Sequence, residues 1–362
     1  MSLSPQQKMN INKVLVITLG FVLINVFIAL LINSAITSSY SLGPSPIYSL
    51  VNYIWLSALV GLLAGSLGGI ALISINKYYF RKKSFRYAMG VAALLYSSVF
   101  ILVNVVNTII STNLRMDNPG LKDILEVWMD ISLNPLTLII YFMWWVISIF
   151  TLFLLQMSDK LGPGVLWKFI RGQYFKPKEE DRIFMFADMR SSTTIAEKIG
   201  HKQYFNLLSD LFADITDTIL NHEGEIYKYV GDEIIISWTL NKGVRKANCL
   251  NCFLQIEKKL IELAPAYQAK YGVSPELKAG VHHGSVMAGE IGIIKKDIIY
   301  SGDVLNTTAR IQEQCNHYNV NLLISDDTLD LLNIEKFKVE PLGSFELRGK
   351  ENIVKLNTVK ER

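Results

Sequence analysis

The feature that most constrains this chain is a set of four apolar runs that contain no charged residue. They span residues 14–32, 54–75, 87–110 and 136–157. A helix needs about 20 apolar residues to cross the hydrocarbon core of a bilayer, and each run is close to that length. We therefore expect residues 1–157 to form an α-helical membrane domain with four transmembrane helices and the lipid bilayer as its partner. The runs also lack histidine, which disfavours a transporter or proton pump, because these usually carry an ionisable group within the membrane.

Basic residues are concentrated in alternate loops of this first part. The connection between the second and third runs carries only basic charges, at Lys77, Arg81, Lys82, Lys83 and Arg86. Basic residues also precede the first run and follow the fourth, whereas the other two connections are uncharged (33–53) or acidic on balance (111–135). By the positive-inside rule, we expect a multi-pass protein of the cell membrane whose two termini and polar half are cytoplasmic.

A ridge of small residues follows one side of the second run. Gly61, Gly65 and Gly69 repeat every four residues, and such a ridge lets two helices approach closely. Packing within one bundle and packing across a dimer are both consistent with this pattern.

The polar half begins after a Gly-Pro-Gly break at residues 162–164. We interpret residues 158–182 as a cytoplasmic linker and residues 183–362 as a second domain. Alternation and helical periodicity predict its elements. The expected strands are 183–187, 225–230, 233–238, 276–283, 286–290, 297–300, 320–324 and more within 337–359; the expected helices lie within 191–221, 241–263 and 304–317. This order is that of a ferredoxin-like α+β sandwich.

Composition excludes two classes of site in the polar half. The net charge is only +4 and no basic run is interleaved with aromatic residues, so we expect no nucleic-acid partner. Cys249 and Cys252 form a C-x-x-C pair, but no second pair completes a four-cysteine zinc site. Their spacing places both on one face of the expected helix, and we interpret them as structural thiols in a reducing compartment.

Two aspartates end predicted buried strands. Asp188 is followed by the small hydroxyl residues Ser191 to Thr193 at the start of a helix, and Asp232 follows Gly231 at a hairpin tip. Two carboxylates held in this way are able to share divalent cations, and a helix start beside them suits phosphate. The pattern predicts a nucleotide site.

Five segments of the polar half, in this order along the chain, carry a resemblance to a known family, and two of them contain Asp188 and Asp232. They read Phe186-Ala187-Asp188-Met189-Arg190-Ser191-Ser192-Thr193, Lys228-Tyr229-Val230-Gly231-Asp232, Gly280-Val281-His282-His283-Gly284, Gly302-Asp303-Val304-Leu305-Asn306-Thr307-Thr308-Ala309-Arg310 and Arg348-Gly349. Together they resemble the class III adenylyl and guanylyl cyclases over about residues 183–359. The resemblance implies that residues 183–362 are a class III nucleotide cyclase catalytic domain.

The resemblance also implies a metal and phosphate site. Asp188, Met189 and Asp232 then form the site of two divalent ions, Mg²⁺ or Mn²⁺. One ion lowers the pKa of the ribose 3′-hydroxyl and the other binds the triphosphate. Ser191, Ser192 and Thr193 supply main-chain amides to the phosphates, although Ser191 and Ser192 replace the Gly-Phe of the family pattern.

Asn306 and Arg310 are implied to act on the ribose and on the α-phosphoryl group. They lie four residues apart, so both project from one face of a helix. Asn306 orients the ribose, and Arg310 stabilises the charge of the transition state. Arg348 is implied to hold the terminal phosphates, with Lys350 close enough to be the alternative. His282 also matches a family position, but we interpret it as structural.

The base-reading positions favour adenine. Lys228 is able to donate to N1 of adenine, whereas the protonated N1 of guanine calls for a carboxylate acceptor. The second base-reading position of the family is Ile299 here rather than Asp, Thr or Ser. Asp297 lies two residues earlier on the same strand face and is a possible substitute.

In this family the metal aspartates of one subunit face the lysine, asparagine and arginine of another. Because this chain holds both sets, a homodimer with two composite sites is expected. We predict a membrane-anchored adenylyl cyclase that converts ATP to 3′,5′-cyclic AMP and pyrophosphate, with the membrane domain as anchor and sensor of a ligand that the sequence does not identify. The alternatives are a guanylyl cyclase, a diguanylate cyclase, and a non-catalytic receptor or scaffold with a cyclase-like domain.

Overall fold

The computed structural model describes residues 5–39, 50–78, 85–116, 119–162, 165, 171–294, 296–346 and 353–362. These residues form two compact units. One is helical and comprises residues 7–161; the other is a mixed α/β unit from Gly162 to Arg362. The two units are described separately.

The helical unit consists of long apolar helices and one short amphipathic helix. Its elements are α1 (Pro5–Ser39), α2 (Leu50–Tyr78), α3 (Phe85–Arg115), α4 (Leu121–Leu133) and α5 (Pro135–Leu161). Four of them contain segments long and apolar enough to cross a membrane: Gln7–Ser34, Tyr53–Ser74, Met89–Ile110 and Thr137–Ser158. The predicted class of this part, a bundle with four membrane-length helices, is confirmed.

The glycine ridge of α2 packs against α1 of the same chain. A Cβ atom on Gly61 would lie 2.7 Å from the Cα of Val22, and one on Gly65 would lie 2.6 Å from the Cα of Thr18. Any side chain at these positions would therefore push the two helices apart. Among the described residues, the ridge serves packing within the bundle.

The mixed unit alternates strands and helices in the order expected of the α+β class. Its elements are β1 (Lys178–Met189), α7 (Ser192–Ile199), α8 (His201–Asn221), β2 (Glu225–Val230), β3 (Glu233–Thr239), α9 (Leu240–Val244), the 3₁₀ turn η2 (Arg245–Ala247), α10 (Asn248–Tyr271), β4 (Leu277–Ile291), β5 (Asp297–Ser301), α11 (Asp303–His317), β6 (Leu322–Ser325), α12 (Asp326–Leu329), β7 (Phe337–Glu346) and β8 (Ile353–Glu361).

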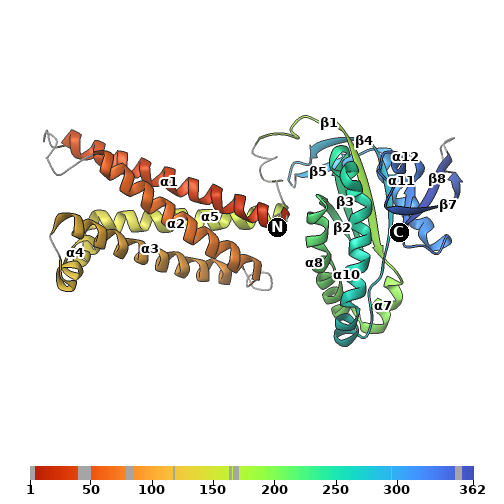
Figure 1. Ribbon diagram of the computed structural model, residues 1–362, viewed down its shortest axis with the longest axis horizontal. Helices are drawn as coiled ribbons and strands as arrows, with labels where there is room; N and C mark the ends of the chain where they lie inside the picture. Colours follow the sequence, from red (N-terminus) through yellow and green to blue (C-terminus); the bar gives the residue numbers. More distant parts are fainter. Residues whose placement is uncertain are drawn as a thin grey trace. The chain divides into compact units, whose positions relative to one another are not determined.

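One sheet organises this unit. Its strands run in the order β2-β3-β1-β4-β6-β8-β7, and β5 pairs with β4 beside this path. All neighbours are antiparallel except β4 and β6. Figure 1 shows α8 and α10 running together along the sheet, where they cover the main hydrophobic core. Helix α11 packs on β4 and β1 with a separate apolar cluster beneath it.

The structure corrects three element boundaries. Strand β1 begins at Lys178 rather than at residue 183, because its first residues already pair with β4. The expected strands 276–283 and 286–290 are the single strand β4, which pairs with β1 without interruption. The helix expected at 241–263 is divided, because Lys246 and Ala247 adopt positive φ angles of 54° and 49°, and α10 then continues to Tyr271.

A buried arginine joins the start of β1 to β2 and β5. Arg182 donates through Nη1 to Glu180 (3.0 Å) and through Nη2 to Glu225 on β2 (2.7 Å). Its guanidinium carbon also lies 4.6 Å from the centre of the Tyr300 ring on β5. The side chain is almost fully buried, so its charge depends on these partners for compensation.

Arg182→Met is expected to lower the free energy of unfolding of the mixed unit by about 3 kcal/mol, because it leaves two poorly solvated carboxylates without their cation. Urea unfolding of the detergent-solubilised protein measures this loss. The triple variant Arg182→Met, Glu180→Gln, Glu225→Gln is the control and should regain most of it. Equal losses in the two variants would show that the arginine stabilises by packing rather than by charge.

Candidate active site

The two predicted metal aspartates lie together at one end of the sheet. The register of β1 and β3 places Asp188 opposite Glu233, and Asp232 precedes Glu233 in the turn after β2. Burial raises the pKa of Asp188, and the nearby carboxyl of Asp232 raises it further. The strand pairing therefore holds the two carboxyl groups close together.

Two partners of Asp188 were not anticipated from the sequence. The Nζ atom of Lys278 on β4 lies 3.3 Å from Oδ2 of Asp188, and Nε2 of Gln312 on α11 donates to the same oxygen at 3.3 Å. Lys278 is a buried cation in a strand whose neighbouring residues are apolar. A single charged residue in an apolar strand can be recognised in the sequence. Only the register of β4 with β1 shows which residue it faces.

Glu233 adds a third carboxyl group beside the pair. Burial raises the pKa of Glu233 to about 7, and the charges of Asp188 and Asp232 act in the same direction. Acidic groups in contact disfavour one another's ionised forms. The three acidic groups therefore concentrate negative charge at this end of the sheet, and this charge would favour the binding of a cation.

The donor set fits an oxygen-seeking divalent cation. Asp188 and Asp232 supply carboxylate oxygens, the type of ligand that Mg²⁺ prefers when phosphate oxygens complete its coordination. The Met189 side chain is buried in the core, so at that position only the main-chain carbonyl is left for a metal. Within the described ranges, no cluster of three or more His, Cys, Asp or Glu side chains has a metal-binding arrangement.

The segment after Asp188 turns sharply into α7. Ser191 adopts a left-handed conformation with φ of 53°, a region that glycine occupies at lower cost than serine. The turn is held by Arg190, whose main-chain N–H donates to the Glu276 carbonyl (2.9 Å) and whose Nε donates to Oδ1 of Asn321 (2.8 Å). Ser191 and Thr193 are exposed and Ser192 is half-buried. The start of α7 therefore faces solvent close to the carboxyl pair.

The residues that the sequence predicts to read the base lie on β2 and β5. The main-chain N–H of Tyr300 donates to the Tyr227 hydroxyl (3.3 Å), and the two rings are 4.9 Å apart. This contact brings Lys228 to the same region as β5, which carries Asp297 and Ile299. Lys228 and Asp297 are exposed, and Ile299 is half-buried.

Asn306 and Arg310 lie on the side of α11 that is turned away from its own sheet. Asn306 is exposed and Arg310 is half-exposed. The opposite side of the helix touches β4 so closely that a Cβ on Gly280 would lie 2.8 Å from the Cα of Gln312. Because Gln312 on that buried side contacts Asp188, Asn306 and Arg310 lie on a different face of α11 from the carboxyl pair of the same chain.

Three other residues were singled out in the sequence, namely Arg348, Lys350 and His282. Arg348 and its alternative Lys350 lie outside the described residues. The Nδ1 atom of His282 lies 2.7 Å from the Ser325 hydroxyl, which in turn contacts Thr328. His282 thus contacts a hydroxyl group at the end of β6, in agreement with a structural role.

The surroundings of the cysteine pair also indicate a structural role. Cys249 and Cys252 are free thiols in the main core. Burial raises the pKa of Cys249 to about 12 and raises that of Cys252 as well, which favours the neutral thiol of a core residue.

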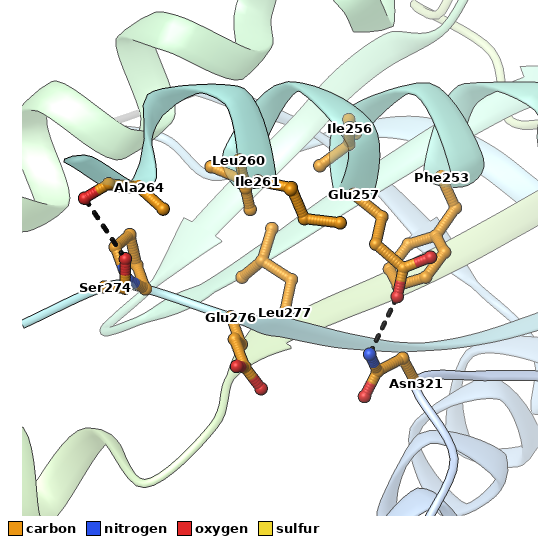
Figure 2. A pocket seen from close by; sticks show the side chains of 11 residues that line it. Phe253, Ile256, Glu257, Leu260, Ile261, Ala264, Ser274, Glu276, Leu277 and Asn321 are labelled. Carbon is orange, nitrogen blue, oxygen red and sulfur yellow. Dashed lines mark hydrogen bonds between the residues drawn. The ribbon is translucent and has the colours of Figure 1, made fainter. Parts of the chain in front are cut away.

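A cavity of about 180 Å³ lies elsewhere, between α10 and the start of β4. Figure 2 shows Phe253, Ile256 and Leu277 in its wall, with Asn321 donating to Glu257 at its edge. Successive residues of a strand point to opposite faces of a sheet. Leu277 faces this cavity and Lys278 faces Asp188, so the cavity and the carboxyl pair lie on opposite faces of the sheet.

A sequence model of the family described as the adenylate and guanylate cyclase catalytic domain matches residues 175–358. This chain belongs to that family. The match starts three residues before β1 and includes the described carboxyl pair, β5 and α11.

Relatives of this cyclase-family chain extend beyond the shared domain. Adenylate cyclase 2 of Rhizobium meliloti (strain 1021) is 38% identical over 200 residues, 55% of this chain and 55% of that protein. Receptor-type guanylate cyclase gcy-28 of Caenorhabditis elegans is 26% identical over 54% of this chain and 15% of its own length. A solved structure of a bacterial light-regulated adenylyl cyclase shares the fold, with a TM-score of 0.55 at 20% identity over 63% of this chain and 67% of that one. The chain thus spans about half of the first relative and less of the second.

Proposed function

We propose that this chain is a membrane-anchored adenylyl cyclase that converts ATP to 3′,5′-cyclic AMP and pyrophosphate. The observation that carries the proposal is the carboxyl pair of Asp188 and Asp232, held beside the exposed start of α7. A cation site next to a helix N-terminus is suited to a triphosphate. The 38% identity to a protein named adenylate cyclase supports the choice among cyclases.

The proposed reaction is a ring closure in which residues of this chain bind and orient the substrate. The ribose O3′ forms a bond to the α-phosphorus, the bond from that phosphorus to the bridging oxygen of the β-phosphate breaks, and the hydroxyl proton goes to solvent. Divalent ions held by Asp188 and Asp232, when bound, lower the pKa of the 3′-hydroxyl and offset the triphosphate charge. The main-chain amides of Ser191, Ser192 and Thr193 bind phosphate oxygens. Asn306 orients the ribose, and Arg310 stabilises the charge on the α-phosphoryl group.

The site is proposed to form between two copies of the chain. Asn306 and Arg310 lie on the exposed side of α11, whereas the carboxyl pair of the same chain contacts the buried side through Gln312. One chain therefore presents two half-sites that do not meet. A two-fold dimer joins each half-site to the complementary one of the partner and gives two equivalent sites.

The helical unit is proposed to anchor the enzyme in the cell membrane with both termini in the cytoplasm, and to act as its sensor. Four of its helices are long and apolar enough to span a bilayer. The basic connection at residues 77–86 supports this orientation.

Selectivity for ATP is the most informative test of the proposed substrate. Lys228→Glu replaces a donor to N1 of adenine by an acceptor for the N1–H of guanine, so the ratio of kcat/KM for ATP to that for GTP should fall roughly tenfold or more. The assay uses detergent-solubilised protein with Mn²⁺ and identifies each cyclic product. Lys202→Glu, at an exposed position on α8, makes the same charge change and should leave the ratio unaltered.

The same assay separates the rival functions. A wild type that prefers GTP would make the chain a guanylyl cyclase, and a wild type that forms no cyclic product from either nucleotide would favour the non-catalytic receptor. Asp297→Ala then shows whether Asp297 replaces the missing acceptor at Ile299. If it does, ATP turnover falls while the dependence on metal concentration stays the same.

A further inference from the structure

The turn that leads from β1 into α7 has a backbone conformation that its own sequence disfavours. Ser191 adopts a φ of 53° and a ψ of 31°, in the left-handed region that is unfavourable for a residue with a Cβ atom. Its side chain is exposed and makes no capping hydrogen bond that would offset this cost. A strained residue of this kind persists only where the surrounding structure holds it, so other residues must fix this turn.

The residue before Ser191 supplies the contacts that hold the turn. Besides the main-chain bond to Glu276, the guanidinium of Arg190 makes two hydrogen bonds to the segment between α11 and β6. It donates through Nε to Oδ1 of Asn321 (2.8 Å) and through Nη2 to the main-chain carbonyl of Val320 (2.5 Å). A planar guanidinium that binds two acceptors at once is fixed in direction as well as in position. Arg190 is half-buried, which shields these bonds from water.

The anchor of Arg190 is itself fixed to the sheet and to α10. The main-chain carbonyl of Asn321 accepts a hydrogen bond from the N–H of Ala279 on β4 (2.7 Å). Its side-chain Nδ2 donates to Oε1 of Glu257 on α10 (2.7 Å), a contact that Figure 2 shows. Because the Asn321 amide nitrogen is engaged by Glu257, its oxygen is kept toward Arg190. The arginine therefore ties the turn to the body of the mixed unit.

The turn begins where the strand ladder ends. Asp188 is paired with Glu233 on one side and with Lys278 on the other, so its backbone is held by the sheet itself. The pairing of β1 with β4 stops at Met189, and the residues that open α7 lie beyond it. Amide groups bind an anion well only when several of them point to one place. The direction of the first amides of α7 thus depends on the turn and not on the sheet.

We propose that Arg190 is a positioning residue of the cyclase reaction. By tying the turn to Val320 and Asn321, it keeps Ser191 in the left-handed conformation and so aims the first amides of α7 at the triphosphate. Its guanidinium is engaged by these two anchors and takes no part in the chemistry itself. The role assigned to the amides rests on the proposed function, whereas the restraint on the turn does not.

Removal of the guanidinium is expected to weaken substrate binding more than turnover. In Arg190→Met, which keeps a long side chain and the main-chain bond but loses two hydrogen bonds, KM for ATP should rise about tenfold. Because Asp188 stays in the strand ladder, kcat should fall less than about threefold. Arg190→Lys keeps the charge without the planar fork, so its KM should lie between the two. The matched control is Arg245→Met, which removes an exposed arginine paired with Glu223, and it should leave both constants unchanged.

A glycine at position 191 tests whether the arginine acts through the strained residue. Glycine adopts the left-handed conformation at little cost, so Ser191→Gly added to Arg190→Met should lower the raised KM at least about threefold. A loss of general stability would not be repaired in this way. A KM that stays fully raised in the double variant would overturn the proposal, and so would a KM for Arg190→Met equal to that of wild type.

Hydrogen exchange measures the restraint without reference to activity. The N–H of Ile195 donates to the Ser191 carbonyl (3.0 Å), so exchange in peptides that cover residues 190–196 reports how often the turn opens. In the detergent-solubilised full chain without nucleotide, Arg190→Met should accelerate this exchange about tenfold or more, and Arg245→Met should not. Unchanged exchange in Arg190→Met would overturn the proposal. Faster exchange in a chain whose wild type forms no cyclic product would support the restraint and refute the cyclase assignment, so the two failures are distinguishable.

Discussion

Asp188→Asn is expected to reduce the formation of cyclic AMP by roughly a thousandfold or more, because it removes a ligand from the proposed cation site. Asparagine has nearly the same shape and keeps an oxygen for the Gln312 amide and Lys278, which both contact Oδ2 of Asp188. The loss should therefore appear in kcat and not in the amount of folded protein. Turnover at saturating Mn²⁺ measures it.

The same substitution has a predictable effect on stability. Burial and the neighbouring Asp232 raise the pKa of Asp188. The folded state therefore holds the proton more tightly than the unfolded state, and the stability that this gives is lost as pH rises through the folded pKa. At neutral pH the ionised carboxylate of Asp188 destabilises the folded state, and asparagine carries no such charge. Without divalent ions the variant should therefore melt no lower than wild type.

Asp330→Asn provides the control for this experiment. Asp330 is exposed at the end of α12, so its substitution should change neither turnover nor melting temperature. An Asp188→Asn variant that retains near wild-type turnover would show that this carboxylate is not a cation ligand. One that loses activity together with folded protein would show that its role is structural.

Mixing two inactive variants is expected to restore about a quarter of the wild-type activity. In a composite dimer, an Asp188→Ala chain still offers an intact Arg310, and an Arg310→Ala chain still offers an intact Asp188. Random pairing at equal amounts makes half of the dimers mixed, and each mixed dimer has one working site of two. One quarter of all sites should therefore be active.

The variants are co-expressed with different affinity tags, and doubly purified dimers are assayed for cyclic AMP. In these purified mixed dimers the expected value rises to about half of wild type, since every dimer has one working site. Co-expression of Asp188→Ala with Asp232→Ala is the control and should stay inactive, because both changes affect the same half-site. A silent mixture of verified mixed dimers would indicate that each site is built within one chain.

Some parts of this architecture follow from local sequence, and others depend on contacts that no local pattern encodes. The four apolar helices follow from the absence of charge over lengths that match a bilayer. Asp188 and Asp232 stand out because each follows a strand-like run beside a turn. The start of β1 was missed because Lys178 to Asp181 are charged, and their strand conformation depends on pairing with β4.

The partners of Asp188 illustrate the same limit at the site. Lys278 is 90 residues from Asp188 (278 − 188 = 90) and meets it only through the register of two strands. Gln312 meets it only because α11 crosses β4 at Gly280, where no side chain keeps the helix away. Likewise, β2 and β5 converge through the contact between Tyr227 and Tyr300. Sequence spacing alone contains none of these distances.

The close crossing at Gly280 has a consequence for a two-fold dimer. At Gly280 helix α11 lies so close to β4 that any side chain there would collide with the backbone of Gln312, and we expect so closely packed a helix and strand to move together. In the proposed dimer, the exposed side of α11 contributes to one site, and its buried side contacts Asp188, which contributes to the other. A displacement that closes one site is therefore transmitted to its twin, and such a dimer should bind its two nucleotides cooperatively rather than independently.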